Sequence, residues 1–327
     1  MHFNDLLPER ILKIVASQGY RPTGVLYPLN SYENRVYEIG VEGGDPVIGK
    51  FYRPERWGPE TLAEEHRFLE KLEELEIPVV RSLELPEATS YSPALAYDPP
   101  FYYSLFPKFR GREHAENTQE DLRWLGRTLG RLHNVGERFS APHRMTLNPE
   151  TYGYQSLDFI LRLDFLPADL RPALEQILSQ ALKLTEPYFQ HAPANIVLHG
   201  DCHPGNVLWN VAGPHLLDFD DMIHAPPVQD LWMLFYGSPE ERAEQRKAFF
   251  EGYEVFRPFD HHSLRLTEPL RTLRMIRHTA WIGGRHEEAI FQRAFPYYRE
   301  RRYWEEFLLS LKEQIALLQE PVEWQHP

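Results

Sequence analysis

The sequence predicts an α+β protein built of two lobes, with strands concentrated in the N-terminal part and helices in the remainder. Three observations support this fold class. The chain has 327 residues, which is more than one hydrophobic core usually serves. Residues 25–54 are rich in β-branched and aromatic side chains, and amphipathic helical patterns dominate after about residue 108. We therefore expect one lobe over residues 1–107 and a second over residues 108–327.

The first third of the chain is predicted to form strands with one helix among them. Three segments favour an antiparallel meander: residues 25–30, 33–41 and 46–54. Residues 60–78 place leucines and a phenylalanine at helical spacing, and Pro78 ends this helix. Further strand-like segments follow at residues 79–85, 94–97 and 101–109.

Amphipathic helices are predicted for most of the chain beyond residue 108. The first begins after Thr118, whose hydroxyl is suited to cap a helix N-terminus. Further helices are predicted at residues 170–189, 228–237, 239–253, 266–284 and 303–319. Two short β-like segments, residues 206–210 and 215–220, interrupt the helices and are separated by a Gly-Pro turn.

The composition excludes several classes of protein. A formal net charge of −13 disfavours attraction to nucleic acid or to an anionic membrane. The only cysteine, Cys202, cannot form an internal disulfide. Residues 1–20 lack the features of a signal peptide, and no stretch reaches about 18 uninterrupted apolar residues. We therefore expect a cytoplasmic monomer that binds neither nucleic acid nor a membrane.

The segment HGDCHPGN, residues 199–206, gathers side chains of several reactive types. A structural zinc site would need paired ligand groups, and the chain has no second cysteine. A cysteine nucleophile is equally weak as an interpretation, because no cysteine-protease signature surrounds Cys202. The remaining chemical interpretation of this segment uses the side chains of Asp201 and Asn206.

The spacing of Asp201 and Asn206 matches that of enzyme sites that transfer a phosphoryl group from a nucleotide. Asn206 follows Asp201 by five residues, and Asp218 ends the apolar strand of the next hairpin. In such a site one carboxylate lies beside the attacking hydroxyl, while an amide oxygen and a second carboxylate hold Mg²⁺. The alternative is that Asp201 and Asn206 only form turns beside Gly and Pro.

Residues upstream of this segment supply the remaining parts of a nucleotide site. Lys50 lies on a predicted strand, where it is placed to hold phosphates, and Glu65 or Glu64 on the following helix is placed to orient it. Taken alone, a lysine on a strand or a glutamate on a helix is more often a surface residue in contact with water than part of a site. Ser31 lies in the turn that would cover the phosphates, although no glycine-rich loop precedes Lys50.

The segment from His199 to Asn206 resembles the H-x-D-x-x-x-x-N pattern of the aminoglycoside phosphotransferase and choline kinase branch of the protein kinase-like fold. The chain has DFD where protein kinases have DFG, and no long activation loop fits before Val228. The longer segments PLNSYENRVY, KFYRPERW, LHGDCHPGN and PVQDLWML are similar to those of the bacterial stress response kinase A family, also called the YihE/RdoA family. This similarity covers nearly the whole chain.

The resemblance implies a bilobal protein kinase-like fold and an ATP-dependent serine/threonine kinase of the bacterial stress response, which also phosphorylates itself. It implies Asp201 as proton acceptor, Asn206 and Asp218 as Mg²⁺ ligands, and Ser31 at the ATP site. It also implies that Asp230 braces the catalytic loop, and Asp220 is a candidate outer acceptor near the metal. A kinase of small molecules such as amino sugars or choline-like alcohols, and a nucleotide-binding scaffold without catalysis, are the alternatives.

Overall fold

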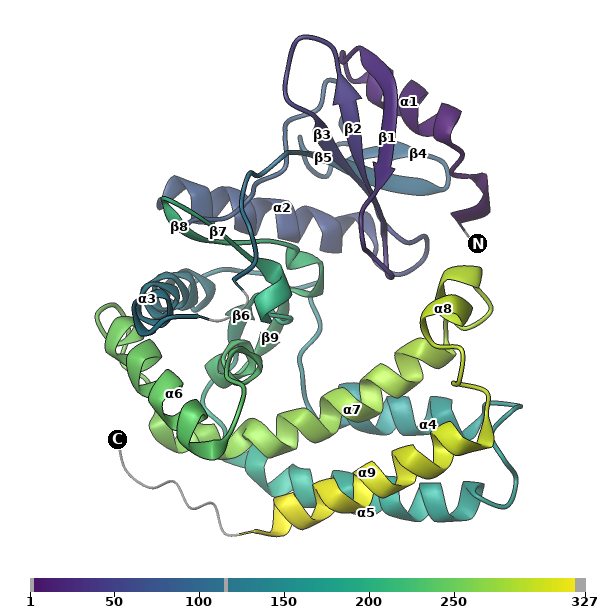
Figure 1. Cartoon of the computed structure of the whole chain (residues 1–327), viewed down its shortest axis with the longest axis vertical. Helices are drawn as coiled ribbons and strands as arrows, with labels where there is room; N and C mark the ends of the chain where they lie inside the picture. Colours follow the sequence, from purple (N-terminus) through teal and green to yellow (C-terminus); the bar gives the residue numbers. More distant parts are fainter. Residues whose placement is uncertain (1–2, 115–116, 321–327) are drawn as a thin grey trace. The chain divides into compact units, whose positions relative to one another are not determined.

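The computed structural model describes residues 3–114 and 117–320, which fall into two compact units (Figure 1). The first unit comprises Met1–Arg144, His199–Met222 and Tyr236–Pro258, and the second comprises Met145–Leu198, Ile223–Phe235 and Phe259–Pro327. All six predicted site residues lie in the first unit. Residues 108–144 group with the N-terminal sheet there, and the lobe boundary after residue 107 stays a prediction.

A five-stranded antiparallel sheet forms the N-terminal part of the first unit. Its strand order is β1-β2-β3-β5-β4. The strands are β1 (Pro22–Pro28), β2 (Arg35–Val41), β3 (Val47–Phe51), β4 (Ala96–Asp98) and β5 (Phe101–Pro107). Helix α1 (Pro8–Ser17) covers one face of this sheet, where its apolar side chains join those of the strands in one core cluster. The predicted meander with a helix among its strands is confirmed.

Strand β3 separates the core from the site by simple alternation of its side chains. Val47 and Phe51 belong to the core cluster beneath α1, whereas Ile48 and Lys50 line a cavity. Lys50 lies opposite Val36 on one neighbouring strand and Ser104 on the other. The central position of β3 therefore fixes the direction in which Lys50 points.

Helix α2 (Pro59–Glu74) follows β3 and begins with a proline, which is favoured in the first turn of a helix. Its apolar residues Leu62, Phe68, Leu69 and Leu72 are buried, as their spacing predicts. Because neighbouring residues of a helix point about 100° apart, Glu64 and Glu65 face different partners.

Helices α3 (Gln119–Gly136) and α6 (Pro239–Tyr253) pack closely against each other in the first unit. Thr118 caps α3 as predicted, since its hydroxyl accepts a hydrogen bond from the Asp121 amide. A Cβ at Gly252 would lie 1.9 Å from the Arg123 carbonyl oxygen, so the two helices approach at a distance that only glycine permits there. The hairpin of β7 (Val207–Asn210) and β8 (Gly213–Leu216) precedes Asp218.

The second unit is mainly helical. Its helices are α4 (Gln155–Leu161), α5 (Arg171–Gln190), α7 (Thr267–Gly283), α8 (Ala289–Ala294) and α9 (Arg301–Gln319). Two short strands that the sequence pattern did not reveal, β6 (Ile196–Leu198) and β9 (Ile223–Ala225), pair antiparallel. None of the helices in residues 3–114 and 117–320 combines the length and apolar character needed to cross a membrane.

Two sequence-based predictions of secondary structure are wrong. Residues 79–85 form no strand, because their backbone amides bond singly to separate partners, such as Val80 to Leu216 and Leu83 to Leu105. Residues 228–237 form no α-helix. They form two 3₁₀ turns, Pro227–Asp230 and Trp232–Leu234, and the backbone is already extended at Phe235.

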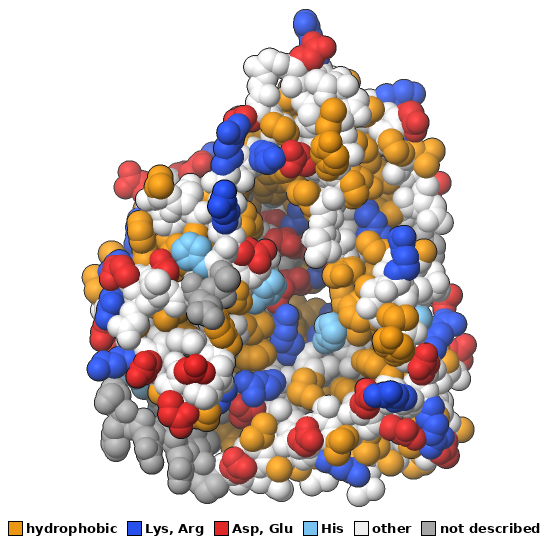
Figure 2. All heavy atoms as spheres, viewed as in Figure 1, with side chains coloured by type: hydrophobic (Ala, Val, Ile, Leu, Met, Phe, Trp, Pro, Cys, Tyr) orange, Lys and Arg blue, Asp and Glu red, His pale blue; other side chains and the backbone are white. Residues whose placement is uncertain are grey.

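Charged side chains of both signs are interspersed on the molecular face drawn in Figure 2. Lys, Arg, Asp and Glu side chains are scattered there among broad areas of hydrophobic and uncharged atoms. The net charge of −13 therefore does not produce a uniformly acidic face in this view.

Candidate active site

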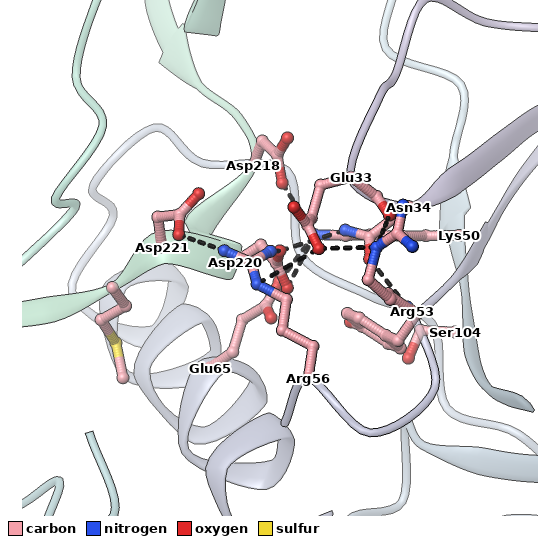
Figure 3. Close-up of polar contacts among 12 residues, drawn as sticks. Glu33, Asn34, Lys50, Arg53, Arg56, Glu65, Ser104, Asp218, Asp220 and Asp221 are labelled. Carbon is pink, nitrogen blue, oxygen red and sulfur yellow. Dashed lines mark hydrogen bonds and ion pairs between the residues drawn. The ribbon is translucent and has the colours of Figure 1, made fainter. Parts of the chain in front are cut away.

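Lys50 lies where three segments of the first unit meet, as Figure 3 shows. Its Nζ lies 2.7 Å from Asp218 Oδ1 and 3.3 Å from Glu65 Oε1. Lys50 is only 5% exposed, and a buried ammonium group needs such partners. We call Lys50, Glu65, Asp218 and Asp220 the charge cluster, since Asp220 Oδ1 lies 3.9 Å from the same Nζ.

Glu65, and not Glu64, is the helix α2 residue that contacts Lys50. The Glu64 carboxylate faces away and lies 2.8 Å from His143 Nδ1. Glu65 is also 3.8 Å from the Arg144 guanidinium, so its buried charge has two cations beside it. The structure therefore brings together Lys50, Glu65 and Asp218.

The charge cluster shifts the pKa values of its members. Burial alone would lower the pKa of Lys50, but Asp218, Glu65 and Asp220 raise this pKa well above its ordinary value. Burial raises the pKa of Glu65 to about 7, while Lys50 counteracts part of that rise. Lys50 therefore keeps its positive charge at neutral pH, as an anion-binding group must.

A cavity of about 320 Å³ lies beside the charge cluster. Five residues predicted from the sequence line it: Ser31, Lys50, Glu65, Asn206 and Asp218. Much of the remaining wall is apolar and includes Leu29, Val36, Ile48, Leu69, Phe106, Leu208 and Phe219. A mostly apolar cavity with a few converging polar groups is typical of a small-molecule site.

The loop of residues 199–206 is held by short-range hydrogen bonds. Asn206 Nδ2 donates to the Asp201 carbonyl oxygen at 2.9 Å, and the Asp201 amide donates to His199 Nδ1 at 3.3 Å. His199 is fully buried, and its Nε2 donates to the Leu217 carbonyl oxygen at 2.7 Å. The imidazole therefore ties the loop to the chain just before Asp218.

Asp201 is not among the residues that line the cavity, and its side chain is 25% exposed. His203 Nε2 lies 3.6 Å from Asp201 Oδ2, which is too long for a hydrogen bond but short enough for an electrostatic contact. Cys202 is buried, as expected for a residue without a role at the surface.

Asn206 and Asp218 supply oxygen atoms that fit a magnesium ion. The bond from Asn206 Nδ2 to Asp201 leaves the amide oxygen of Asn206 as a ligand. The Asp218 side chain is about half exposed and lines the same cavity. An amide oxygen and a carboxylate are hard ligands of the kind Mg²⁺ prefers. Among residues 3–114 and 117–320, no group of three or more His, Cys, Asp or Glu side chains is placed to hold a metal ion.

Asp220 is held by partners that the sequence does not indicate, and its role as an outer acceptor near the metal stays a prediction. It is 3% exposed, and its carboxylate contacts Arg56 and accepts a hydrogen bond from Asn34 Nδ2 at 3.1 Å. Burial would raise the pKa of Asp220, but Arg56, Lys50 and Arg144 lower it to about 2. Sequence reasoning missed these partners, although the segment KFYRPERW places several cations directly after Lys50.

Asp230 lies in the second unit and is fully buried in the 3₁₀ turn Pro227–Asp230. Its predicted support of the 199–206 loop stays a prediction.

The family comparison agrees with this geometry. A family model described as "Phosphotransferase enzyme family" matches residues 26–267. The chain belongs to this family. The matched range begins within β1 and includes every candidate residue of the site. The chain is therefore a phosphotransferase, and the charge cluster and the cavity form its candidate active site.

Two curated relatives are similar to this phosphotransferase over nearly its whole length. "Stress response kinase A" of Escherichia coli O157:H7 is 34% identical over 319 residues, which is 98% of this chain and 95% of the relative. "Serine/threonine protein kinase RdoA" of Salmonella typhimurium (strain LT2) is 34% identical with the same coverage. The resemblance to the stress response kinase A family is confirmed.

A solved structure of an amicoumacin kinase, in complex with AMP-PNP, Ca²⁺ and Ami, shares the fold of this phosphotransferase. The TM-score is 0.71 at 18% sequence identity, and the match covers 95% of this chain and 96% of the other. This likeness confirms the α+β kinase-like fold class that the sequence predicts.

Proposed function

We propose that this phosphotransferase is an ATP-dependent serine/threonine protein kinase that requires Mg²⁺, phosphorylates itself and serves a bacterial stress response. The names of the two curated relatives support the kind of acceptor and the physiological setting. One observation carries the reaction class: Lys50 contacts both Glu65 and Asp218 beside a cavity that Ser31 and Asn206 also line. We also propose that the protein is cytoplasmic and monomeric, and that its lobe boundary follows residue 107.

The wall of the cavity combines apolar side chains with a few charged and polar ones. Apolar side chains such as Val36, Ile48 and Leu69 suit the faces of a nucleotide base. Lys50 supplies a fixed positive charge for phosphate oxygens, and Glu65 holds its ammonium group in place. Ser31 lies in the turn above the cavity, where its hydroxyl donates to the Asn34 carbonyl oxygen at 3.3 Å. We infer that the backbone amides of this turn face the phosphates.

Asp201 is the proposed proton acceptor. Its carboxylate orients the acceptor hydroxyl for in-line attack and takes its proton as the hydroxyl oxygen bonds to the γ-phosphorus of ATP, while the bond from that phosphorus to the β,γ-bridging oxygen breaks and ADP leaves. Asn206 and Asp218 are the proposed ligands of Mg²⁺. When bound, the metal neutralises negative charge on the transferring phosphates. The bond from Asn206 to the Asp201 backbone couples the metal-binding and proton-accepting parts of the loop.

Incubation of the purified protein with γ-labelled ATP and Mg²⁺, first alone and then with protein and small-molecule acceptors, tests this proposal. We expect label on serine or threonine of the protein itself and of protein acceptors. Asp201→Asn should abolish labelling while ATP still binds. Label that appears only in a supplied amino sugar or amino alcohol would contradict the proposed acceptor. Mutant labelling as fast as wild type would contradict the role of Asp201.

A further inference from the structure

Arg56 lies in the connection between β3 and α2, within the segment KFYRPERW, and no role in the site follows for it from the sequence. Its two terminal nitrogens contact two different carboxylates: Nη1 contacts Asp220 and Nη2 contacts Asp221 (Figure 3). Its Nε lies 3.6 Å from Glu33 Oε1, and its guanidinium also lies over the Trp57 ring. The side chain is only 13% exposed, so these contacts are largely shielded from water.

The residues that Arg56 holds come directly after Asp218. Asp218 has a backbone φ of 57°, a left-handed conformation that is unfavourable for most residues other than glycine. Arg144 Nη1 donates to the Asp220 carbonyl oxygen at 2.6 Å, so the backbone of this short turn is fixed as well as its side chains. The surrounding contacts therefore maintain the conformation that directs Asp218 toward Lys50 and the cavity.

Asn34 extends the same set of contacts to the turn above the cavity. Its Nδ2 donates to Asp220 at 3.1 Å, and its Oδ1 accepts a hydrogen bond from the Arg53 amide at 3.0 Å. The Asn34 carbonyl oxygen accepts the Ser31 hydroxyl. Asp220 thus links the turn that carries Ser31 to the segment that carries Asp218.

We propose that Arg56 is a positioning residue that fixes Asp218 for metal binding by holding the two carboxylates that follow it. This inference depends on the proposed function, because Asp218 is a metal ligand only in that proposal. Arg56 does not touch the transferring group. It holds Asp220 between Asn34 and Lys50, and the orientation of Asp218 depends on that position.

An arginine suits this role better than a lysine. Two carboxylates on adjacent residues, Asp220 and Asp221, require two donors at a fixed spacing, which a planar guanidinium provides and a single ammonium does not. Removal of Arg56 leaves Glu33, Asp220 and Asp221 close together without this cation. The repulsion among them would act on the turn that carries Asp218.

Manganese binding in the presence of AMP-PNP tests the proposal without requiring catalysis. Mn²⁺ serves as a paramagnetic substitute for Mg²⁺, and its free fraction is measured by electron paramagnetic resonance. For Arg56→Gln we expect the Mn²⁺ dissociation constant of the AMP-PNP complex to rise at least about 10-fold, as loss of an outer support of a metal ligand does. Arg56→Lys should restore part of the affinity, and Asp221→Asn should cause a smaller rise.

Arg81→Gln is the matched control, because Arg81 also contacts several carboxylates, those of Glu70, Glu73 and Glu84, away from the charge cluster. Its Mn²⁺ affinity should equal that of wild type. A folded Arg56→Gln protein with the affinity of the control would overturn the proposal. If Arg56→Gln does not fold, Arg56→Lys decides, and wild-type affinity in that variant would equally overturn it.

The proposed function and this inference fail in different ways. A Mn²⁺ affinity that depends on Arg56, together with a wild-type protein that labels no protein acceptor, would overturn only the proposed function. Normal protein labelling with no effect of Arg56 on Mn²⁺ affinity would overturn only the inference.

Discussion

The charge cluster around Lys50 and the loop of residues 199–206 are held in place in different ways. The contact of Lys50 with Asp218 joins residues 168 positions apart in the sequence. The loop depends on neighbours, since Asn206 bonds to Asp201 five residues away and Asp201 bonds to His199 two residues away. Lys50, Glu65 and Asp220 of the cluster are also buried and ionisable, whereas the loop bonds join amide and imidazole groups and backbone atoms.

This difference indicates where a substitution can lower activity without lowering stability. The loop assembles locally, so a substitution of its reactive carboxylate leaves the supporting bonds intact. The cluster balances buried charges from distant segments, so the removal of one charge leaves others without partners. Substitutions in the cluster should therefore reduce stability and activity together, and a substitution of the reactive group in the loop should reduce activity alone.

Lys50→Met is expected to have the largest effect. It leaves the buried carboxylates of Glu65 and Asp220 without their shared ammonium group, and loss of one partner of a buried ion pair costs about 3–5 kcal/mol. Urea unfolding measures this loss, and phosphoryl transfer should also disappear. Lys50→Arg keeps the charge and should keep most of the stability. A Lys50→Met protein as stable as wild type would show that the cluster does not depend on charge balance.

Asp201→Asn is the contrasting substitution in the loop. The rate of transfer should fall about 10²–10⁴-fold, the usual contribution of a positioned proton acceptor. The free energy of unfolding should change by less than about 0.5 kcal/mol, because the Asp201 backbone still bonds to Asn206 and His199. Single-turnover kinetics and urea unfolding of the same preparation measure both quantities. A large loss of stability would remove the distinction between the two regions.

The parts of this site that the sequence predicts are those whose placement follows from local patterns. The alternation of β3 directs Lys50 away from the core, and the predicted helix after it offers Glu65 or Glu64 as a partner, of which the structure selects Glu65. Asn206 and Asp218 are fixed by their distance from Asp201 and by the short hairpin between them. None of these placements requires knowledge of distant contacts.

The contacts that the sequence does not predict join distant segments. Arg56 and Asp220 are 164 positions apart, and no periodicity marks either residue as a partner of the other. The same limit explains residues 79–85, whose composition favours a strand but whose amides find separate partners. Residues 228–237 have a helical pattern of apolar side chains, yet they form two 3₁₀ turns that end before an extended Phe235.

His66, beside Glu65 on α2, should make the cluster region sensitive to acid. Its ring contacts the hydroxyls of Tyr52, Ser92 and Ser104, and burial lowers its pKa to about 3. In the unfolded chain a histidine binds a proton below about pH 6.5. The unfolded state therefore gains a proton that the folded state excludes, and stability falls as the pH drops from about 6.5 toward 3.

The expected slope from His66 is about 1.4 kcal/mol per pH unit in that range. Urea unfolding of wild type and His66→Gln at pH values between 8 and 5 measures it. The variant is less stable at pH 8 but should lose less stability on acidification. Equal slopes for the two proteins would show that His66 is not kept neutral by the fold.

Ser31→Ala is expected to have the smallest effect, because it removes one hydrogen bond at the edge of the cavity. The Ser31 hydroxyl donates to the Asn34 carbonyl oxygen at 3.3 Å, and such a bond contributes about 0.5–1.5 kcal/mol. The KM for ATP should rise about 2- to 10-fold as the turn loosens. The maximal rate should stay the same, since Lys50, Asp201 and Asp218 are untouched. Steady-state kinetics at varied ATP concentrations measures KM and the maximal rate separately. Ser17→Ala on α1 is the control, because the Ser17 hydroxyl makes a comparable bond to the Ile14 carbonyl oxygen and lies far from the cavity residues in sequence. A fall in the maximal rate without a change in KM would mean that the turn acts on the transferring phosphate. The turn would then affect activity alone, as is expected for the reactive group of the 199–206 loop.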